Sequence, residues 1–234
     1  MRCERQQRFL GKECLEKVQA SVVAIVGAGS LGSRNADAFA RIGVKRIILI
    51  DDDDVSKENI STQIYEETDE GKPKVNATAA RLKKINPKIA VDAVKKRLDE
   101  TNAAELLHKA DMIIDGTDNY ATRYIINEYC VEKSVPWVMG ACAGSRGIVA
   151  AFVPGGPCLS CVMPVESTSG EDACSAGVLG ETAGMVSALQ VAQAVNILSG
   201  NNTTGKMVHF DILGQDFEAA AMERRDDCFC SGEW

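Results

Sequence analysis

Residues 21–32 have the sequence Ser-Val-Val-Ala-Ile-Val-Gly-Ala-Gly-Ser-Leu-Gly, and this stretch decides the fold. The apolar run Ser21–Gly27 is typical of a buried parallel strand, because both faces of such a strand lie under helices. Gly27, Gly29 and Gly32 then form a turn that opens a helix. Small residues let the backbone approach a phosphate, and free N–H groups at the start of a helix favour an anion. The stretch therefore predicts a strand, a turn and a helix that hold a nucleotide.

The residues that follow extend this stretch to a βαβ unit. We expect the helix to reach Ile42 and to end at Gly43, and Lys45–Ile50 is a second β-branched strand. Asp51 ends that strand, where a carboxylate can hold the hydroxyls of a ribose. A glycine-rich turn can also occur without a ligand. The combination of strand, glycines, helix and acid makes that interpretation the weaker one.

Strands and helices keep alternating as far as residue 144. Helices are predicted over residues 72–86, 102–109 and 119–133, strands over 89–94, 111–115 and 135–142, and a first helix over 7–19. This alternation predicts an α/β fold, a Rossmann-like, doubly wound and mostly parallel sheet. Ligands of such a sheet bind at the carboxyl ends of its strands.

The sequence changes character after Gly144. Residues 147–153 predict a strand, whereas residues 154–177 are rich in Gly, Pro, Ser and Cys, and such long irregular stretches are usually functional. A helix over 180–198 and strands over 206–212 and 216–222 follow. We expect a single domain over residues 1–234, made of an N-terminal helix or arm (1–20), a nucleotide-binding part (21–144) and a smaller mixed β part (145–234).

Composition excludes several classes of protein. The chain has 234 residues, of which 45% are hydrophobic and 25% are charged, as in ordinary globular domains. Its net charge of −7 disfavours nucleic acid as the main ligand, because neutralising phosphates needs clustered Lys and Arg. The apolar runs are far shorter than the ~20 residues that span a bilayer, and residues 1–5 lead into no apolar signal segment. We therefore expect a cytoplasmic protein without a membrane partner.

The glycine turn and the acid do not distinguish NAD from ATP. An NAD-dependent oxidoreductase would need a general acid or base beside the nicotinamide. The only histidines, His108 and His209, stand in no evident motif, and we expect both to be structural.

An ordered set of motifs gives the chain a family resemblance. In chain order the motifs are Gly27-Ala28-Gly29-Ser30-Leu31-Gly32, Ile50-Asp51-Asp52-Asp53-Asp54-Val55, Asn59, Gly71-Lys72-Pro73-Lys74, Ile85-Asn86-Pro87 and Asp115-Gly116-Thr117-Asp118-Asn119. Together they resemble the ThiF/MoeB/HesA family, which contains the relatives of ubiquitin-activating enzymes. The resemblance extends from Arg2 to Gly232.

This resemblance implies an adenylyltransferase that uses ATP and Mg²⁺. Its substrate would be the C-terminal glycine carboxylate of a ubiquitin-like sulfur-carrier protein that ends in Gly-Gly, in thiamine, molybdopterin or related sulfur transfer. A carboxylate that attacks an α-phosphate brings two anions together, so cations must offset the charge. Because the chain shows no rhodanese-like extension, we expect the sulfur to come from another protein.

The resemblance also implies a set of nucleotide contacts. Asp51 would bind the ribose, and Asn59 and Lys74 would contact the phosphates. The full expected set is Gly27, Gly29, Ser30, Gly32, Asp51, Asp53, Asn59, Lys74, Asp118 and Asn119.

Four residues are implied in catalysis, namely Arg5, Lys74, Asp118 and Cys174. Asp118 would hold Mg²⁺, with Asp53 as a possible second ligand. Arg5 matches an arginine that reaches the phosphates of the neighbouring subunit, so the resemblance implies a homodimer. Without the resemblance, Arg5 would be a surface arginine, Lys74 a solvated lysine at a helix start and Asp118 a helix N-cap.

One position departs from the family pattern. The family usually carries Asn-Leu-x-Arg-Gln, whereas this chain has Asn59-Ile60-Ser61-Thr62-Gln63, so Thr62 stands where a guanidinium would clamp a phosphate. A threonine offers one neutral donor in place of a charged fork. Either adenylation is slower, or Arg34 or Arg123 compensates.

Four of the nine cysteines form two pairs, Cys158/Cys161 and Cys228/Cys230. Four thiolates suit tetrahedral zinc, and the family binds structural Zn²⁺ with two C-x-x-C pairs. The second pair here is one residue shorter, so paired core or redox thiols stay an alternative. The zinc would attach the C-terminal tail to the loop that follows the sheet.

Cys174 aligns with a family cysteine that can form a sulfur link to the carrier. An inert loop cysteine is an equally good interpretation, because adenylation itself needs no thiol. We expect the remaining cysteines to be packing residues or bystanders: Cys3, Cys14, Cys130 and Cys142.

Two further hypotheses keep the nucleotide site. One is the ATP-dependent tRNA-modifying dehydratase branch of the family, which the acidic balance and the cysteine pairs disfavour. The other is a nucleotide-binding relative with weak or no catalysis, which Thr62 motivates.

Overall fold

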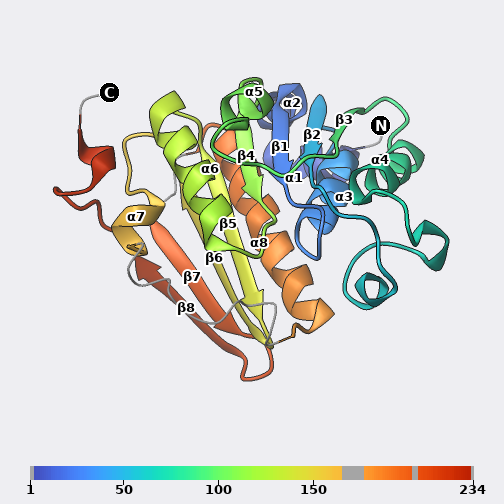
Figure 1. Cartoon of the computed structure of the whole chain (residues 1–234). Coiled ribbons are helices and arrows are strands. Elements are labelled where there is room, and N and C mark those ends of the chain that lie inside the picture. The colour runs from blue at the N-terminus through green and yellow to red at the C-terminus, as the bar shows by residue number, and fades with distance from the viewer. Residues whose placement is uncertain (1–2, 165–176, 202–204, 233–234) are drawn as a thin grey trace.

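The computed structural model describes residues 3–164, 177–201 and 205–232, which form a single eight-stranded sheet with helices packed against it (Figure 1). The strands are β1 (Val22–Val26), β2 (Arg46–Ile50), β3 (Ala90–Val94), β4 (Met112–Asp115), β5 (Trp137–Ala143), β6 (Arg146–Phe152), β7 (Lys206–Asp211) and β8 (Asp216–Ala221). The helices are α1 (Glu4–Leu10), α2 (Lys12–Ala20), α3 (Gly32–Ile42), α4 (Lys74–Ile85), α5 (Ala103–Leu107), α6 (Tyr120–Lys133), α7 (Leu159–Val162) and α8 (Gly180–Leu198), with 3₁₀ turns η1 (Lys57–Ser61), η2 (Glu67–Asp69) and η5 (Phe229–Ser231).

The sheet has a parallel half and an antiparallel half. Its order is β3-β2-β1-β4-β5-β6-β7-β8, and the pairs from β3 to β5 are parallel, whereas the pairs from β5 to β8 are antiparallel. The predicted mostly parallel sheet that continues into a mixed β region is confirmed. The chain order reverses between β1 and β4, and a crevice for ligands opens at such a switch point.

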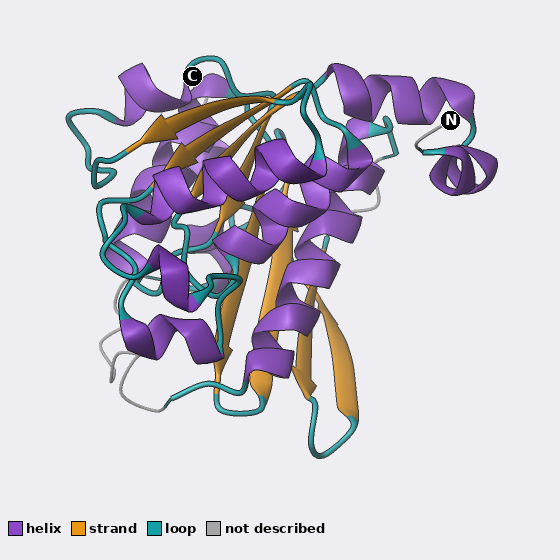
Figure 2. Cartoon of the chain, turned by 90° about the vertical axis from the view of Figure 1, so that its right-hand side faces the viewer, coloured by secondary structure: helices purple, strands orange, loops and turns teal. Residues whose placement is uncertain are grey.

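Helices cover both faces of the parallel half, as the turned view shows (Figure 2). Side chains from α2, α3, α4 and α8 form one apolar cluster with alternate strand residues such as Ile25 and Leu49. Side chains from α5, α6 and α7 form a second cluster with the intervening residues, such as Val26 and Ile50. This two-sided burial explains the continuous apolar runs Val22–Val26 in β1, residues 47–50 in β2 and residues 112–114 in β4.

The N-terminal segment differs from its prediction. A single helix over residues 7–19 is wrong, because Gly11 separates α1 from α2 with φ 82° and ψ 160°. No helix can contain that conformation, and glycine adopts it at little cost. None of the described helices is long and apolar enough to cross a membrane.

Candidate functional site

The loops after β1 and β4 come into contact at the switch point through three glycines, namely Gly27, Gly32 and Gly116. A Cβ on Gly27 (φ +90°) would lie 2.5 Å from the Gly116 carbonyl oxygen, and a Cβ on Gly32 would lie 1.8 Å from the Gly27 oxygen. Gly29 is different, since its nearest neighbour would be the Gln63 amide at 4.0 Å. Gly27 and Gly32 therefore allow close packing of backbone, whereas Gly29 leaves open space above the turn.

Asp51 supports the glycine turn from the end of β2. Its carboxylate accepts hydrogen bonds from the backbone N–H groups of Ala28, at 2.6 Å, and Asp53, at 2.8 Å. Burial raises the pKa of Asp51 above its usual value, and these two donors act against that shift. Carboxylate oxygens can accept more than one bond each, so Asp51 keeps capacity for ribose hydroxyls.

Lys74 lies at the same edge of the sheet. It is the first residue of α4, its exposed fraction is only 7%, and its ammonium group lies 2.7 Å from the Asp53 carboxylate. The Lys74 N–H also donates to the Asp53 carbonyl oxygen at 3.0 Å. A solvated lysine at a helix start is therefore wrong, because the ammonium group is directed at the acidic turn after β2.

Tyr65 joins the glycine turn to α4, although no motif in the sequence singles it out. Its buried hydroxyl donates to the Ala28 carbonyl oxygen at 2.6 Å and lies 3.1 Å from the Thr78 hydroxyl. Burial raises the pKa of Tyr65 well above its usual range, so the hydroxyl keeps its proton. The only sequence signal is an aromatic residue between two polar stretches, which does not predict this contact.

The segment around η1 faces the turn from the other side. Asn59 is partly buried, and its side-chain oxygen accepts a bond from the Ser56 N–H at 3.0 Å. Ser30 donates to the Thr62 hydroxyl at 3.3 Å. Arg34, from the first turn of α3, donates to the Thr62 carbonyl oxygen at 3.2 Å. Of the two arginines proposed to compensate for Thr62, Arg34 is the one beside it.

Unpaired polar atoms concentrate at this place. Within the described ranges, four buried side-chain nitrogen or oxygen atoms have no hydrogen-bond partner, and three of them belong to Ser33, Arg34 and Gln63. Ser33 and Arg34 lie in the first turn of α3, and Gln63 lies opposite Gly29. Buried unpaired groups are costly, and a polar ligand above the turn could satisfy them.

A buried ion pair holds the turn after β4. The Arg123 side chain is 4% exposed and donates to the fully buried Asp115 carboxylate at 2.9 Å. Arg123 also donates to the carbonyl oxygens of Thr117 and Gly140, at 2.8 and 3.1 Å. The guanidinium thus fixes the turn that leads to Asp118.

Asp118 is exposed at the end of this turn, and Asn119 follows it. The Asn119 side chain accepts a bond from the Thr122 N–H at 2.9 Å, so Asn119 is the N-cap of α6. The N-cap interpretation of Asp118 is wrong, and its carboxylate accepts from the side-chain amide of Asn119 at 3.4 Å. Asp51, Asp52 and Asp53 form a separate acidic group whose oxygens lie within 4.8 Å of one another.

One predicted catalytic residue, Arg5, is not brought to the turn by this chain. Arg5 is exposed on α1, next to Cys3, whose thiol lies 3.3 Å from the carbonyl oxygen of Ile42 at the far end of α3. The glycine turn lies at the start of α3, and a helix of the length of α3 spans roughly 15 Å. Arg5 is therefore remote from the glycine turn of its own chain. Cys174 lies outside the described residues. Of the histidines, His108 lies 2.7 Å from the Glu105 carbonyl oxygen.

The four paired cysteines come together although 70 residues separate Cys158 from Cys228. The sulfur atoms all lie within 4.8 Å, with separations of 3.5 Å for Cys158 to Cys228, 3.5 Å for Cys161 to Cys230 and 3.9 Å for Cys158 to Cys161. Four thiolates around zinc at about 2.3 Å would stand roughly 3.8 Å apart. The Arg225 N–H lies 3.5 Å from the Cys161 sulfur and can donate to it. The shorter second pair therefore reaches the cluster with both sulfurs.

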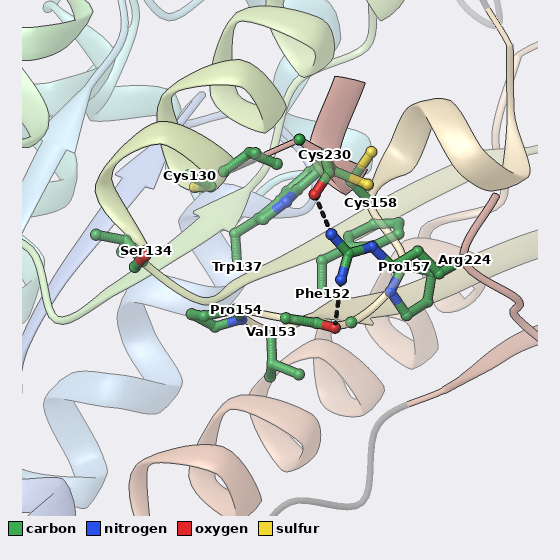
Figure 3. A pocket seen from close by; sticks show the side chains of 15 residues that line it. Cys130, Ser134, Trp137, Phe152, Val153, Pro154, Pro157, Cys158, Arg224 and Cys230 are labelled. Carbon is green, nitrogen blue, oxygen red and sulfur yellow. Dashed lines mark hydrogen bonds between the residues drawn. The ribbon is translucent and has the colours of Figure 1, made fainter. Parts of the chain in front are cut away.

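A cavity of about 250 Å³ lies beside this cysteine cluster (Figure 3). Its lining includes Trp137 at the start of β5, whereas the glycine turn follows the end of parallel strands, so the cavity is at the opposite edge of the sheet. Arg224 spans it, because its guanidinium donates to the carbonyl oxygens of Gly155 and Cys230. Arg224 thus links the loop after β6 to the C-terminal cysteines.

Comparison with known proteins gives one consistent family. The ThiF family model matches residues 3–231. The chain is 32% identical to the SAMP-activating enzyme E1 of Haloferax volcanii, over 96% of this chain and 85% of that protein. It is 33% identical to the sulfur carrier protein ThiS adenylyltransferase of Bacillus subtilis (97% and 70%) and 32% identical to the molybdopterin-synthase adenylyltransferase of Escherichia coli (96% and 91%).

Solved structures show the same fold. The crystal structure of Escherichia coli MccB with MccA-N7isoASN superposes with a TM-score of 0.86, covers 99% of this chain and 74% of that one, and is 22% identical in sequence. At this identity the likeness concerns the fold alone.

Proposed function

Because this chain belongs to the ThiF family, we propose that it uses ATP to adenylate the C-terminal glycine carboxylate of a ubiquitin-like sulfur-carrier protein. The pathway would be thiamine, molybdopterin or related sulfur transfer, as the names of the ThiS and molybdopterin-synthase relatives suggest. The observation that carries the proposal is the convergence of the glycine turn, Asp51 and the buried Lys74 at the switch point of the sheet.

The chemistry needs positioning and charge compensation from the protein. A carboxylate oxygen of the carrier attacks the α-phosphorus of ATP, a new C(O)–O–P bond forms, and pyrophosphate leaves with the electron pair of the broken P–O bond. Lys74 would offset charge on the phosphates, and the N-terminus of α3 would add free N–H donors. Asp51 would hold the ribose, so that the α-phosphorus stays in place for the attack.

Magnesium fits the acidic residues of this site. Asp118 is exposed and is not the N-cap of α6, and Asp53 stands beside Lys74, so oxygen ligands are available from both sides of the switch point. When bound, Mg²⁺ would neutralise negative charge on the phosphate chain.

Carrier-dependent exchange of pyrophosphate into ATP tests the function. The purified chain should catalyse exchange with a Gly-Gly carrier and not with the same carrier lacking its terminal glycine. Lys74→Ala and Asp118→Ala should abolish most of it. Lys72→Ala is the matched control, because Lys72 belongs to the same segment but pairs with Asp69 at 2.9 Å. Absence of exchange with every carrier, while ATP still binds, would support the non-catalytic relative instead.

We also propose that the active unit is a homodimer in which Arg5 serves the neighbouring site. The support is the position of Arg5, exposed and remote from its own glycine turn. Subunit mixing tests it: Arg5→Ala and Lys74→Ala should each be inactive, and a mixture should regain part of the activity, because one site of a mixed dimer keeps both residues. No recovery in a mixture shown to contain mixed dimers would contradict the shared site.

For the cysteine cluster we propose structural Zn²⁺, supported by the sulfur separations and by the Arg225 N–H that points to Cys161. Metal analysis of the purified chain should find zinc in stoichiometric amount, and Cys230→Ser should lower it. Cys14→Ser is the control, since Cys14 lies on α2, outside the cluster. Equal zinc in both variants would contradict the assignment.

The role of Cys174 and the cellular location of the protein are also proposals. A covalent sulfur link at Cys174 stays a prediction, and Cys174→Ala should leave exchange intact. Among the described residues no disulfide joins the cysteines, which fits a reducing compartment, and a cytoplasmic location is proposed on that basis.

A further inference from the structure

Arg34 is a cationic side chain in the first turn of α3, which follows the glycine turn, and the proposed chemistry does not use it. It is the third residue of α3, two positions after Gly32. Its guanidinium donates to the Thr62 carbonyl oxygen at 3.2 Å, while its Nε is buried and has no hydrogen-bond partner among the described residues. Within residues 3–164, 177–201 and 205–232 it forms no ion pair, in contrast to Lys74 and Arg123.

The surroundings of this guanidinium carry positive charge. A Cβ on Gly180 would lie 3.8 Å from one guanidinium nitrogen, and a Cβ on Gly184 would lie 3.9 Å from the other. Arg34 therefore passes across the first turns of α8, while it stands in the first turn of α3. Neither helix has a side-chain hydrogen bond at its N-cap, and each N-terminus carries about half a positive charge.

A cation at two helix N-termini is unfavourable unless an anion joins it. The partner oxygen that Arg34 has is a neutral carbonyl, which is a weaker acceptor than a phosphate. Gly180 and Gly184 leave the space for the guanidinium, and the Thr62 hydroxyl that Ser30 contacts adjoins the same corner. The region between Arg34, Thr62 and the first turn of α8 therefore favours a bound anion, and the described side chains around it do not supply one.

We infer that Arg34 is a phosphate-binding catalytic residue, whose guanidinium contacts the β- and γ-phosphates of ATP and offsets the charge on the departing pyrophosphate. The inference rests on the proposed function. In this proposal the guanidinium comes from α3 and contacts the phosphates beside Thr62. The arginine thereby contributes to the release of pyrophosphate and has no part in recognition of the adenosine or of the carrier.

Binding measurements separate this inference from the function on which it rests. Calorimetric titration with ATP and with AMP, both with magnesium, needs no carrier and no turnover. Arg34→Ala should weaken ATP binding roughly 10- to 100-fold, the value of a hydrogen bond to a charged group, and should leave AMP binding unchanged. Arg34→Lys should recover part of the loss, because it keeps the charge, and Arg34→Gln should not.

Two further variants complete the design. Arg41→Ala is the matched control, since Arg41 lies on the same helix but is exposed and paired with Asp37, and it should bind ATP as the native chain does. Thr62→Arg in the Arg34→Ala background should restore ATP binding from the other side of the corner. Unchanged ATP binding in Arg34→Ala would overturn the inference, and so would an equal loss of ATP and AMP, which would indicate damage to the turn. Failure of carrier-dependent exchange by the native chain would overturn the proposed function alone.

Discussion

Replacing Arg123 by methionine should cost a large part of the stability of this protein. The substitution keeps an apolar chain of similar length but leaves the Asp115 carboxylate, which is fully buried, without its cation. Removing one partner of a buried pair costs about 3–5 kcal/mol, because an uncompensated charge then remains in the interior. The carbonyl oxygens of Thr117 and Gly140 lose a donor in the same step, which places the expected cost toward the upper end.

A second substitution tests the reason for that cost. Asp115→Asn removes the buried charge. It keeps a side-chain oxygen that can accept from the Thr117 N–H, as the native Asp115 carboxylate does at 2.9 Å. Adding it to Arg123→Met should therefore raise the free energy of unfolding above that of Arg123→Met alone. Arg146→Met is the control, because Arg146 pairs with Asp211 at the surface, with 83% of its side chain exposed, and solvent weakens such pairs.

Urea unfolding followed by tryptophan fluorescence gives the free energies. Trp137 is buried between the helices and the sheet, so its emission should report the loss of the core. The slope of free energy against urea should stay the same among the variants, which would show that native compactness is unchanged. A loss below about 1 kcal/mol for Arg123→Met, or a double variant less stable than the single one, would refute the uncompensated-charge reasoning.

Three further changes have defined outcomes. Gly32→Ala should prevent folding or abolish ATP binding, because its Cβ would lie 1.8 Å from the Gly27 carbonyl oxygen, and soluble yield with an ATP titration would show which. Tyr65→Phe should lower the free energy of unfolding by about 1–3 kcal/mol and weaken ATP binding, since the Ala28 carbonyl loses its buried donor; an unchanged melting curve would contradict this. Burial raises the pKa of Cys130 above its usual 9.0, so the folded state keeps a proton that the unfolded chain releases in alkali. The free energy of unfolding should fall above pH 9.0, and urea titrations of Cys130→Ala on either side of that pH should show a shallower fall.

The sequence predicted those parts of the fold that depend on neighbours in the chain. The run Val22–Val26 and the glycines after it specify strand, turn and helix through burial and backbone freedom, and the structure has the predicted order of elements. Gly11 is the exception. Its neighbours all favour helix, and only the tertiary packing of α1 and α2 shows that the chain bends there.

The site was predictable only where motifs carry it. Lys74 and Asp51 were found because they stand in recognisable motifs, but the ion pair of Lys74 with Asp53 and its burial could not be inferred from spacing. Tyr65 depends on a contact across 37 residues, for which no local pattern exists, and the choice of Arg34 over Arg123 as the arginine beside Thr62 depends on a contact across 28 residues. Whether the short Cys228/Cys230 pair completes the cluster is likewise a matter of how β8 and η5 place the chain end relative to α7.

The cysteine cluster has a consequence for the order of events during synthesis. Cys158 and Cys161 leave the ribosome after the first six strands, but their partners follow only when the seventh and eighth strands have emerged. The parallel half of the sheet and its helices can therefore fold before Cys228 and Cys230 are available to the cluster. If the cluster binds zinc as proposed, metal binding would be the last step of folding, and a zinc-depleted cell would accumulate chains with a folded nucleotide-binding part and an unattached C-terminal segment.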